Sequence, residues 1–193
     1  MMTRANLGTR LWPAALVFGA LLLHALTKLE RGLLGEMLWA CHAASLLVGL
    51  GMLARQTWLV ATGTLFHLGV GVPAYVLDLV VLQSTTLTSV LVHLVPPLLG
   101  LLVLRREPVW SCWPRWTPLA AGALYPCLIP ISRWLTEPAL NVNLAFRPWS
   151  PLATLSPSPW PSWLGNLFAM AVLLPLADRW VRRWLGPGGA VYG

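Results

Sequence analysis

The chain has 193 residues, of which 57% are hydrophobic and only 10% are charged, whereas an average soluble domain has about 25% charged residues. A soluble domain of this length leaves much of its surface in water and cannot bury so many apolar side chains. The net charge of +7 comes from basic residues scattered between apolar runs. Composition therefore excludes a soluble enzyme and a nucleic-acid-binding protein, and it predicts an integral membrane protein.

The hydrophobic runs predict an all-α bundle of about six transmembrane helices in a single domain. A spanning helix needs about 20 mostly apolar residues. Six segments meet this requirement, at residues 11–27, 33–54, 58–82, 85–104, 118–135 and 163–180. The first apolar run is longer than that of a secretory signal, so we expect it to remain as the first span.

The distribution of basic residues predicts that both termini lie in the cytoplasm. With six spans, nine basic residues fall on one side of the membrane: Arg4, Arg10, Arg55, Arg105, Arg106, Arg115, Arg179, Arg182 and Arg183. The other side holds four: Lys28, Arg31, Arg133 and Arg147. Because Lys and Arg concentrate on the cytoplasmic side of membrane proteins, we expect a multi-pass protein of the plasma or inner membrane with this orientation.

The longest connection between predicted spans is the extramembrane loop at residues 136–162, which reads TEPALNVNLAFRPWSPLATLSPSPWPS. Its prolines and asparagines disfavour a regular helix. Because the loop also contains aromatic and aliphatic residues, we expect it to lie against the membrane or to cap the bundle. Loops of this kind often carry functional residues, and a purely structural cap is the alternative.

Ionisable residues inside a span are costly in lipid, so each is a candidate functional residue. They are His24, Glu36, Cys41, His42, His67, Asp78 and His93. Cys41 and His93 each lie eight residues from the outer end of their predicted spans, or roughly 12 Å deep at 1.5 Å per residue. Equal depth on two helices allows these two side chains to meet inside the bundle.

A thiol beside an imidazole has a specific chemistry. The imidazole takes the thiol proton, and the thiolate then attacks an ester carbonyl and holds the acyl group as a thioester. Histidine is the usual base in such pairs. Cys41 and His93 therefore predict an acyl-transfer or ester-hydrolysis site. The alternatives are structural: a buried cysteine often packs as a small hydrophobe, and an intramembrane histidine often binds a helix carbonyl.

Two other function classes fit the same residues. His42 and His93 lie at similar depth, and paired imidazoles from two helices can ligate one haem. A non-catalytic subunit or assembly factor of a larger membrane complex would use its polar groups for helix contacts. The motifs HExxH and GxSxG and the P-loop are absent. Cys41, Cys112 and Cys127 are too few and too dispersed for a disulfide framework or a CxxC metal site.

Three segments occur in order over Leu33–Leu176: LWACHAASLL, SVLVHLVPPLLGLL and NVNLAFRPWSPLATLSPSPWPSWL. Together they resemble the histidine-and-cysteine helix, the key-histidine helix and the asparagine-containing loop of YwaF-like integral membrane proteins. Vertebrate relatives of that family are cysteine acyltransferases that remodel phospholipids. A more distant branch contains the androgen-induced fatty-ester hydrolases.

The resemblance implies roles for four residues. Cys41 would be the acyl-accepting nucleophile and His93 its base, while Asn141 and Asn143 would close or polarise the site. The implied partners are membrane lipids, and the resemblance implies no cofactor, metal or nucleic acid. We therefore expect a lipid-modifying enzyme, either an acyltransferase or a hydrolase, with its site near the outer leaflet.

Overall fold

A computed structural model describes residues 5–82, 85–106 and 114–185. Over these residues the chain is helical and contains no strand, which confirms that the fold is all-α. The helices are α1 (Ala5–Glu30), α2 (Ala40–Ala54), α3 (Thr57–Phe66), α4 (Val72–Leu82), α5 (Leu87–Arg106), α6 (Thr117–Leu135) and α7 (Trp160–Leu185). The shorter elements are a π-helical turn, η2 (His67–Gly71), and the 3-10 helices η1 (Leu34–Leu38), η4 (Val142–Leu144) and η5 (Ser150–Leu152).

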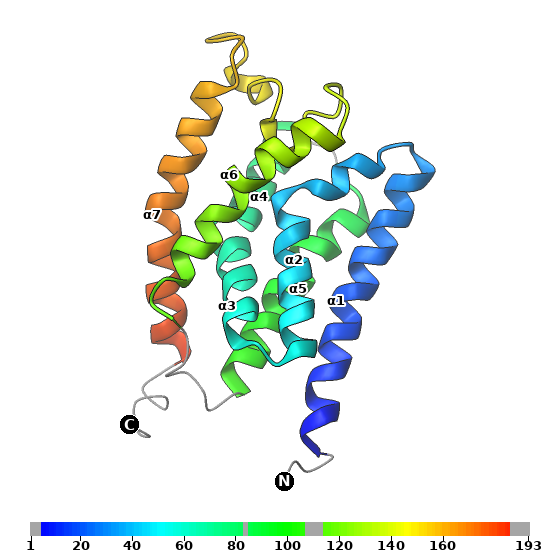
Figure 1. Cartoon of the computed structure of the whole chain (residues 1–193), viewed down its shortest axis with the longest axis vertical. Helices are drawn as coiled ribbons and strands as arrows, with labels where there is room; N and C mark the ends of the chain where they lie inside the picture. Colours follow the sequence, from blue (N-terminus) through cyan, green and yellow to red (C-terminus); the bar gives the residue numbers. More distant parts are fainter. Residues whose placement is uncertain (1–4, 83–84, 107–113, 186–193) are drawn as a thin grey trace.

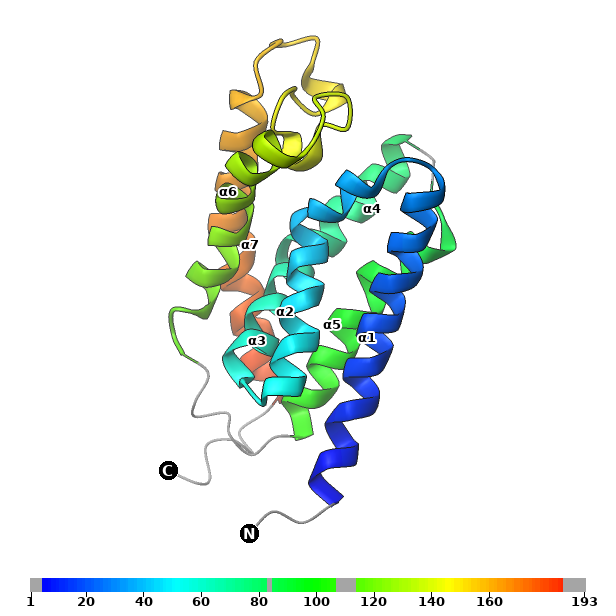
Figure 2. The same ribbon diagram turned by 45° about the vertical axis from the view of Figure 1, so that its right-hand side comes forward.

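The helices form one elongated bundle (Figure 1). α1 begins and α7 ends at the same end of the bundle, and the connection between α6 and α7 covers the opposite end. α2 packs against α1, α3 and α5, while α6 and α7 lie side by side next to α3 (Figure 2). Every residue from Val60 to His67 is buried, so α3 is the centre of the core.

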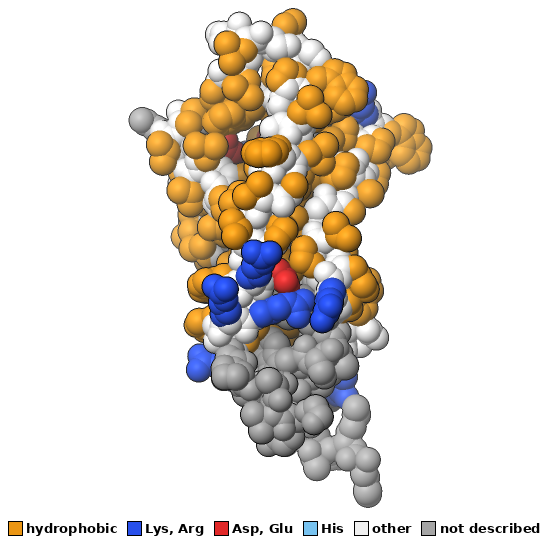
Figure 3. All heavy atoms as spheres, turned by 90° about the vertical axis from the view of Figure 1, so that its left-hand side faces the viewer, with side chains coloured by type: hydrophobic (Ala, Val, Ile, Leu, Met, Phe, Trp, Pro, Cys, Tyr) orange, Lys and Arg blue, Asp and Glu red, His pale blue; other side chains and the backbone are white. Residues whose placement is uncertain are grey.

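The surface of the bundle is suited to lipid. Four described segments are long and apolar enough to cross a membrane: Leu11–Glu30, Thr57–Val81, Leu87–Arg106 and Trp160–Leu185. Leucine and phenylalanine side chains stand exposed along them, with Phe168 at 73%. Figure 3 shows that Lys and Arg gather in a band at one end of this apolar surface. A large exposed apolar surface bounded by basic residues is typical of a multi-pass integral membrane protein.

The second predicted span, residues 33–54, is not one continuous helix. The chain forms η1, and Trp39 then takes an extended backbone conformation with φ −58° and ψ 141° before α2 begins at Ala40. Cys41 therefore lies in the first turn of α2 and not two turns inside a helix, as counted from the sequence. The break lies within an apolar run without proline, so hydrophobicity gives no sign of it.

The third predicted span is one continuous rod that contains a π-helical turn. The Val72 N–H donates to His67 O, five residues earlier. Pro73 follows directly; it has no N–H, and in an α-helix its ring would clash with the carbonyl of Gly69. The wider turn before Pro73 relieves this clash. Gly71 lies four residues after His67 and next to its ring.

α2 and α3 approach each other closely at a glycine. A Cβ atom on Gly63 would lie 2.3 Å from the backbone oxygen of Ala44 and 2.7 Å from a methyl carbon of Val48. In membranes, small residues allow helix backbones to pack at such short range. This contact holds α3 and the adjoining His67 against α2, which carries Cys41.

Replacing this glycine is expected to destabilise the fold. Gly63→Ala should lower the free energy of unfolding by about 1–3 kcal/mol, the usual cost of overpacking, because the new methyl group meets backbone that cannot move aside. Thermal unfolding in mild detergent measures the loss. Gly19→Ala in α1 is the matched control, since a Cβ there meets nothing within 4 Å. Equal stability of the two variants would contradict the close contact.

Candidate functional site

All four histidines of the chain meet inside the bundle. They lie on α1, α2, η2 and α5 and are each at most 8% exposed: His24, His42, His67 and His93. The ring centres are 5.0 Å apart for His24 and His42, and 6.3 Å apart for His42 and His93. The ring centres of His67 and His93 are 6.4 Å apart. We call these four residues the histidine cluster.

Hydrogen bonds to backbone carbonyls fix the tautomers of two cluster members. His42 Nδ1 lies 3.1 Å from Glu36 O, and His93 Nδ1 lies 2.8 Å from Ser89 O. A carbonyl oxygen only accepts, so each ring donates its Nδ1–H and keeps a lone pair on Nε2 when neutral. His42 Nε2 is buried and has no hydrogen-bond partner among the described residues. It is therefore free to accept a proton or a hydrogen bond from a ligand.

His67 is oriented by a serine on α2. Ser45 Oγ lies 2.9 Å from His67 Nε2 and donates its own proton to Cys41 O at 2.9 Å. With this single proton on Cys41 O, the hydroxyl oxygen accepts Nε2–H from the imidazole. The lone pair is then on His67 Nδ1, which is buried and has no hydrogen-bond partner within the described part of the chain.

Two further contacts hold the cluster in place. The ring of Tyr75 stacks on that of His93, with centres 4.1 Å apart and planes inclined by 7°, and its hydroxyl group hydrogen-bonds to Thr85. On the other side, His24 Nδ1 lies 3.0 Å from Thr88 Oγ1. α4 and α1 are thereby both connected through the cluster to the start of α5.

Cys41 lies at the edge of the histidine cluster. Its side chain is half-buried in the first turn of α2, next to His42 in sequence and one turn before Ser45. No hydrogen bond joins Cys41 Sγ to a histidine among the described residues, and the Nδ1–H of His93 is used by Ser89 O. The hydrogen bond of the predicted dyad of Cys41 and His93 is thus not formed in this structure.

Asn143 joins the loop to the beginning of α2. Its Oδ1 accepts from the Ala40 N–H at 2.9 Å, and its Nδ2 donates to Leu38 O and to Ser132 Oγ, each at 2.9 Å. The side chain is completely buried. All of its amide groups are therefore occupied, and it satisfies a first-turn N–H that a capping side chain would otherwise bind.

Asn141 organises the loop itself. Its Oδ1 accepts from the backbone N–H groups of Phe146 and Arg147, at 3.0 and 2.8 Å, and its Nδ2 donates to Arg147 O at 3.1 Å. The side chain is more exposed than that of Asn143. The two asparagines predicted to polarise the site therefore both make structural hydrogen bonds here.

The loop caps the end of the bundle, one of the two arrangements expected from its sequence. Trp149 Nε1 donates to Asp78 Oδ1 on α4 at 3.1 Å, and Trp163 Nε1 donates to Leu144 O at 2.8 Å. Near the same end, Lys28 at the end of α1 forms an ion pair with Glu36 of η1. Asp78 and Glu36, both candidates from the sequence, thus bind neighbouring elements.

Of the two remaining cysteines, the structure describes one, and it does not join the cluster. Cys127 is exposed on α6. Cys112 lies outside the described residues. The sequence assigned neither residue a role.

Four members of this site lie outside the pairs predicted from the sequence: His24, His67, Ser45 and Tyr75. Two of them, His24 and Ser45, left a signal in the sequence. His24 lies six residues before the end of α1 at Glu30, and His93 lies six residues after the start of α5 at Leu87. Their depth along the helices therefore places them at one level. Ser45 follows Cys41 by four residues and hence shares its helix face. The stacking of Tyr75 on His93 leaves no comparable pattern, because it depends on how α4 packs against α5.

Among the described residues, no group of three or more His, Cys, Asp or Glu side chains is arranged to hold a metal ion. Comparison with protein-family models, curated proteins and solved structures finds no match to the chain. The chemistry of the site is therefore argued from its own geometry.

The Asn143 hydrogen bonds are expected to be a major support of the loop. Asn143→Ala should lower the free energy of unfolding by about 2–4 kcal/mol, because Ala40 N–H and Leu38 O each lose a buried partner. Thermal unfolding and trypsin cleavage after Arg147 measure the effect. Asn141→Ala is the matched control, since both asparagines have a left-handed backbone conformation but Asn141 is less buried. An equal effect of both variants would refute the special role of Asn143.

Proposed function

We propose that the protein is a membrane enzyme that transfers the acyl group of a lipid ester through a thioester on Cys41, or hydrolyses that ester. The observation that carries this proposal is a cysteine at a helix start beside a cluster of buried imidazoles. Two of these imidazoles have a nitrogen atom without a hydrogen-bond partner in the described part of the chain. A buried polar atom without a partner costs about 1–3 kcal/mol. Such atoms are typical of sites that bind a ligand or a proton.

The proposed reaction uses three features of the site. An imidazole of the cluster, which the sequence assigns to His93, takes the Cys41 proton, and the thiolate attacks the ester carbonyl. The position at the start of α2 favours the thiolate, because the helix dipole is positive there. The Cys41 N–H makes no backbone hydrogen bond within the described residues. It is a suitable donor to the developing oxyanion. The side-chain amides of Asn141 and Asn143 are already hydrogen-bonded elsewhere and do not fill this role.

The proposed topology has six spans with both termini in the cytoplasm, and it puts the site towards the outer leaflet. Its support is the band of basic residues at the end of the bundle where α1 begins and α7 ends (Figures 1 and 3). Arg105 lies over the Trp184 ring at this end, 5.2 Å from its centre, as expected of an interface with lipid headgroups. The proposed substrates are membrane lipids, which reach a site at this depth and which the resemblance to YwaF-like proteins also implies.

The acyl-enzyme is expected to be detectable by mass. The protein is placed in phosphatidylcholine nanodiscs with p-nitrophenyl palmitate as acyl donor, and its intact mass is taken before and after hydroxylamine, which cleaves thioesters. The proposal predicts a hydroxylamine-labile acyl adduct that is lost in Cys41→Ala and kept in Cys127→Ala, because Cys127 is an exposed cysteine away from the cluster. An adduct that survives in Cys41→Ala, or its absence from the wild type, would contradict the proposal.

Haem binding is the second candidate, favoured by one observation. His42 and His93 have ring centres 6.3 Å apart, and each ring holds its Nδ1–H on a carbonyl so that Nε2 is left to ligate. One turn along α2, however, Ser45 Oγ lies 3.4 Å from Val92 O on α5. This close contact of α2 and α5 opposes the insertion of a porphyrin between them.

The two candidate functions predict different absorption spectra of the purified protein. The acyl-enzyme proposal predicts that the purified protein has no Soret band, and that added haemin keeps the broad spectrum of free haemin without the sharp, red-shifted Soret band of a bis-histidine haem. A Soret band that is lost in both His42→Ala and His93→Ala would establish the haem candidate in its place.

A further inference from the structure

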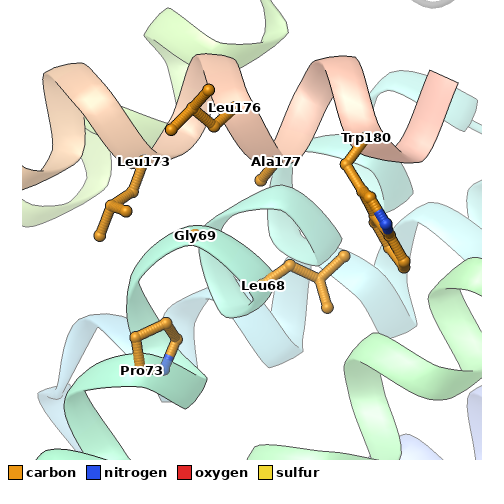
Figure 4. A pocket seen from close by; sticks show the side chains of 7 residues that line it. All are labelled: Leu68, Gly69, Pro73, Leu173, Leu176, Ala177 and Trp180. Atoms are coloured by element: carbon orange, nitrogen blue, oxygen red, sulfur yellow. The ribbon is translucent and has the colours of Figure 1, made fainter. Parts of the chain in front are cut away.

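The two faces of η2 have different surroundings. One face forms a wall of an apolar groove against α7, lined by Leu68, Gly69, Pro73, Leu173, Leu176, Ala177 and Trp180 (Figure 4). The other face carries His67 and Gly71 towards α2. The π turn thus separates a surface open to lipid from the histidine cluster by the thickness of one helix.

Gly71 leaves a space between an imidazole nitrogen and the cysteine. A Cβ atom on Gly71 would lie 3.1 Å from His67 Nδ1 and 3.7 Å from Cys41 Cβ. Any larger residue would occupy the region through which a proton could pass between the two side chains. His67 Nδ1 is the nitrogen that carries the lone pair, and it is buried without a hydrogen-bond partner among the described residues.

Ser45 completes this arrangement. It lies one turn after Cys41 on the same face of α2, donates to Cys41 O and accepts from His67 Nε2. A nucleophile, a base and a third group that orients the base form the recurring triad of covalent catalysis. Here the third group is a neutral hydroxyl that holds the base by its Nε2–H.

We propose that His67, and not His93, accepts the Cys41 proton, so that Cys41, His67 and Ser45 act as a nucleophile, base and orienting group. The assignment rests on the proposed acyl-transfer function. His93 contacts His67 edge to face at 6.4 Å and is itself held by Ser89 O and the Tyr75 ring. It therefore packs against the base, whose orientation is held by Ser45.

The proposed step is balanced in atoms and charge. His67 Nδ1 takes the thiol proton of Cys41, the sulfur forms a bond to the ester carbonyl carbon, and the bond from that carbon to the leaving oxygen breaks. The imidazolium returns the proton to the leaving oxygen. A lysolipid hydroxyl group or water then gives its proton to Nδ1 and attacks the thioester, which breaks the carbon–sulfur bond and restores the thiol. No oxidant, metal or cofactor takes part in this sequence.

The test compares two histidine variants in the full-length protein in mild detergent. Cys112 and Cys127 are replaced by alanine so that Cys41 is the single thiol. N-Ethylmaleimide, a small uncharged probe, labels Cys41 at neutral pH, and mass spectrometry follows the rate. His67→Gln keeps an N–H for Ser45 but loses the nitrogen that accepts the proton. We expect it to slow labelling about tenfold and thioester formation about 100-fold, and His93→Gln to change either by about threefold at most.

The relative loss in the two variants decides the assignment. A loss confined to His67→Gln supports it. An equal or greater loss in His93→Gln overturns it, as does unchanged labelling in His67→Gln. Size-exclusion chromatography and thermal unfolding establish that each variant is folded.

A pair of glycine variants decides the question if His67→Gln does not fold. Gly71→Ala introduces a methyl group between His67 Nδ1 and Cys41 without removing a reactive group. Gly69→Ala makes the same change in the same turn, but its methyl group points at Leu174 Cδ2, 2.9 Å away on α7. We expect Gly71→Ala to slow labelling of Cys41 about tenfold and Gly69→Ala to leave it within about threefold. Equal rates in the two variants overturn the proposal.

The two readouts separate this proposal from the proposed function. Labelling that depends on His67, with no thioester in the wild type, would support the Cys41–His67 pair and refute acyl transfer. A thioester that forms equally well in His67→Gln would support acyl transfer and overturn the assignment of His67.

Discussion

The geometry of the candidate site depends on the single proton of the Ser45 hydroxyl group. Ser45 Oγ lies 2.9 Å from both Cys41 O and His67 Nε2. With the hydroxyl proton on the carbonyl, the oxygen of Ser45 accepts Nε2–H from the imidazole, and the imidazole lone pair is left on the nitrogen beside Gly71. Unpaired polar groups are expensive in a membrane interior. One serine thereby joins α2 to η2 and selects the tautomer of a histidine on another helix.

The loop between α6 and α7 stabilises the helices that carry the site. Asn143 binds the first N–H of α2 and the carbonyl of Leu38, which secures the helix start one residue before Cys41. Trp149 binds Asp78 on α4, the helix that also carries Tyr75. The loop therefore supports both sides of the histidine cluster through hydrogen bonds, without a side chain of its own in it.

Counting residues from helix ends predicted part of the site. It put Cys41 and His93 at one depth, and both lie at or in the cluster. Depth does not determine the face that a residue presents, and His93 faces Tyr75 and Ser89 O. His67 was a candidate residue outside the predicted pair of Cys41 and His93. It meets Ser45 because α3, which ends one residue before His67, packs closely against α2 where Gly63 faces Ala44.

Composition and apolar runs alone determined that the chain is helical, that its surface suits lipid and approximately where its helices lie, because these properties arise from neighbouring residues along the chain. The start of α2 at Ala40 was decided by the tertiary structure, since the group that binds its N–H, Asn143, is 103 residues away. The convergence of four histidines was decided in the same way. Contacts between helices depend on which face each helix turns towards its neighbours. Because these helices carry apolar residues on every face, the sequence does not show which face that is.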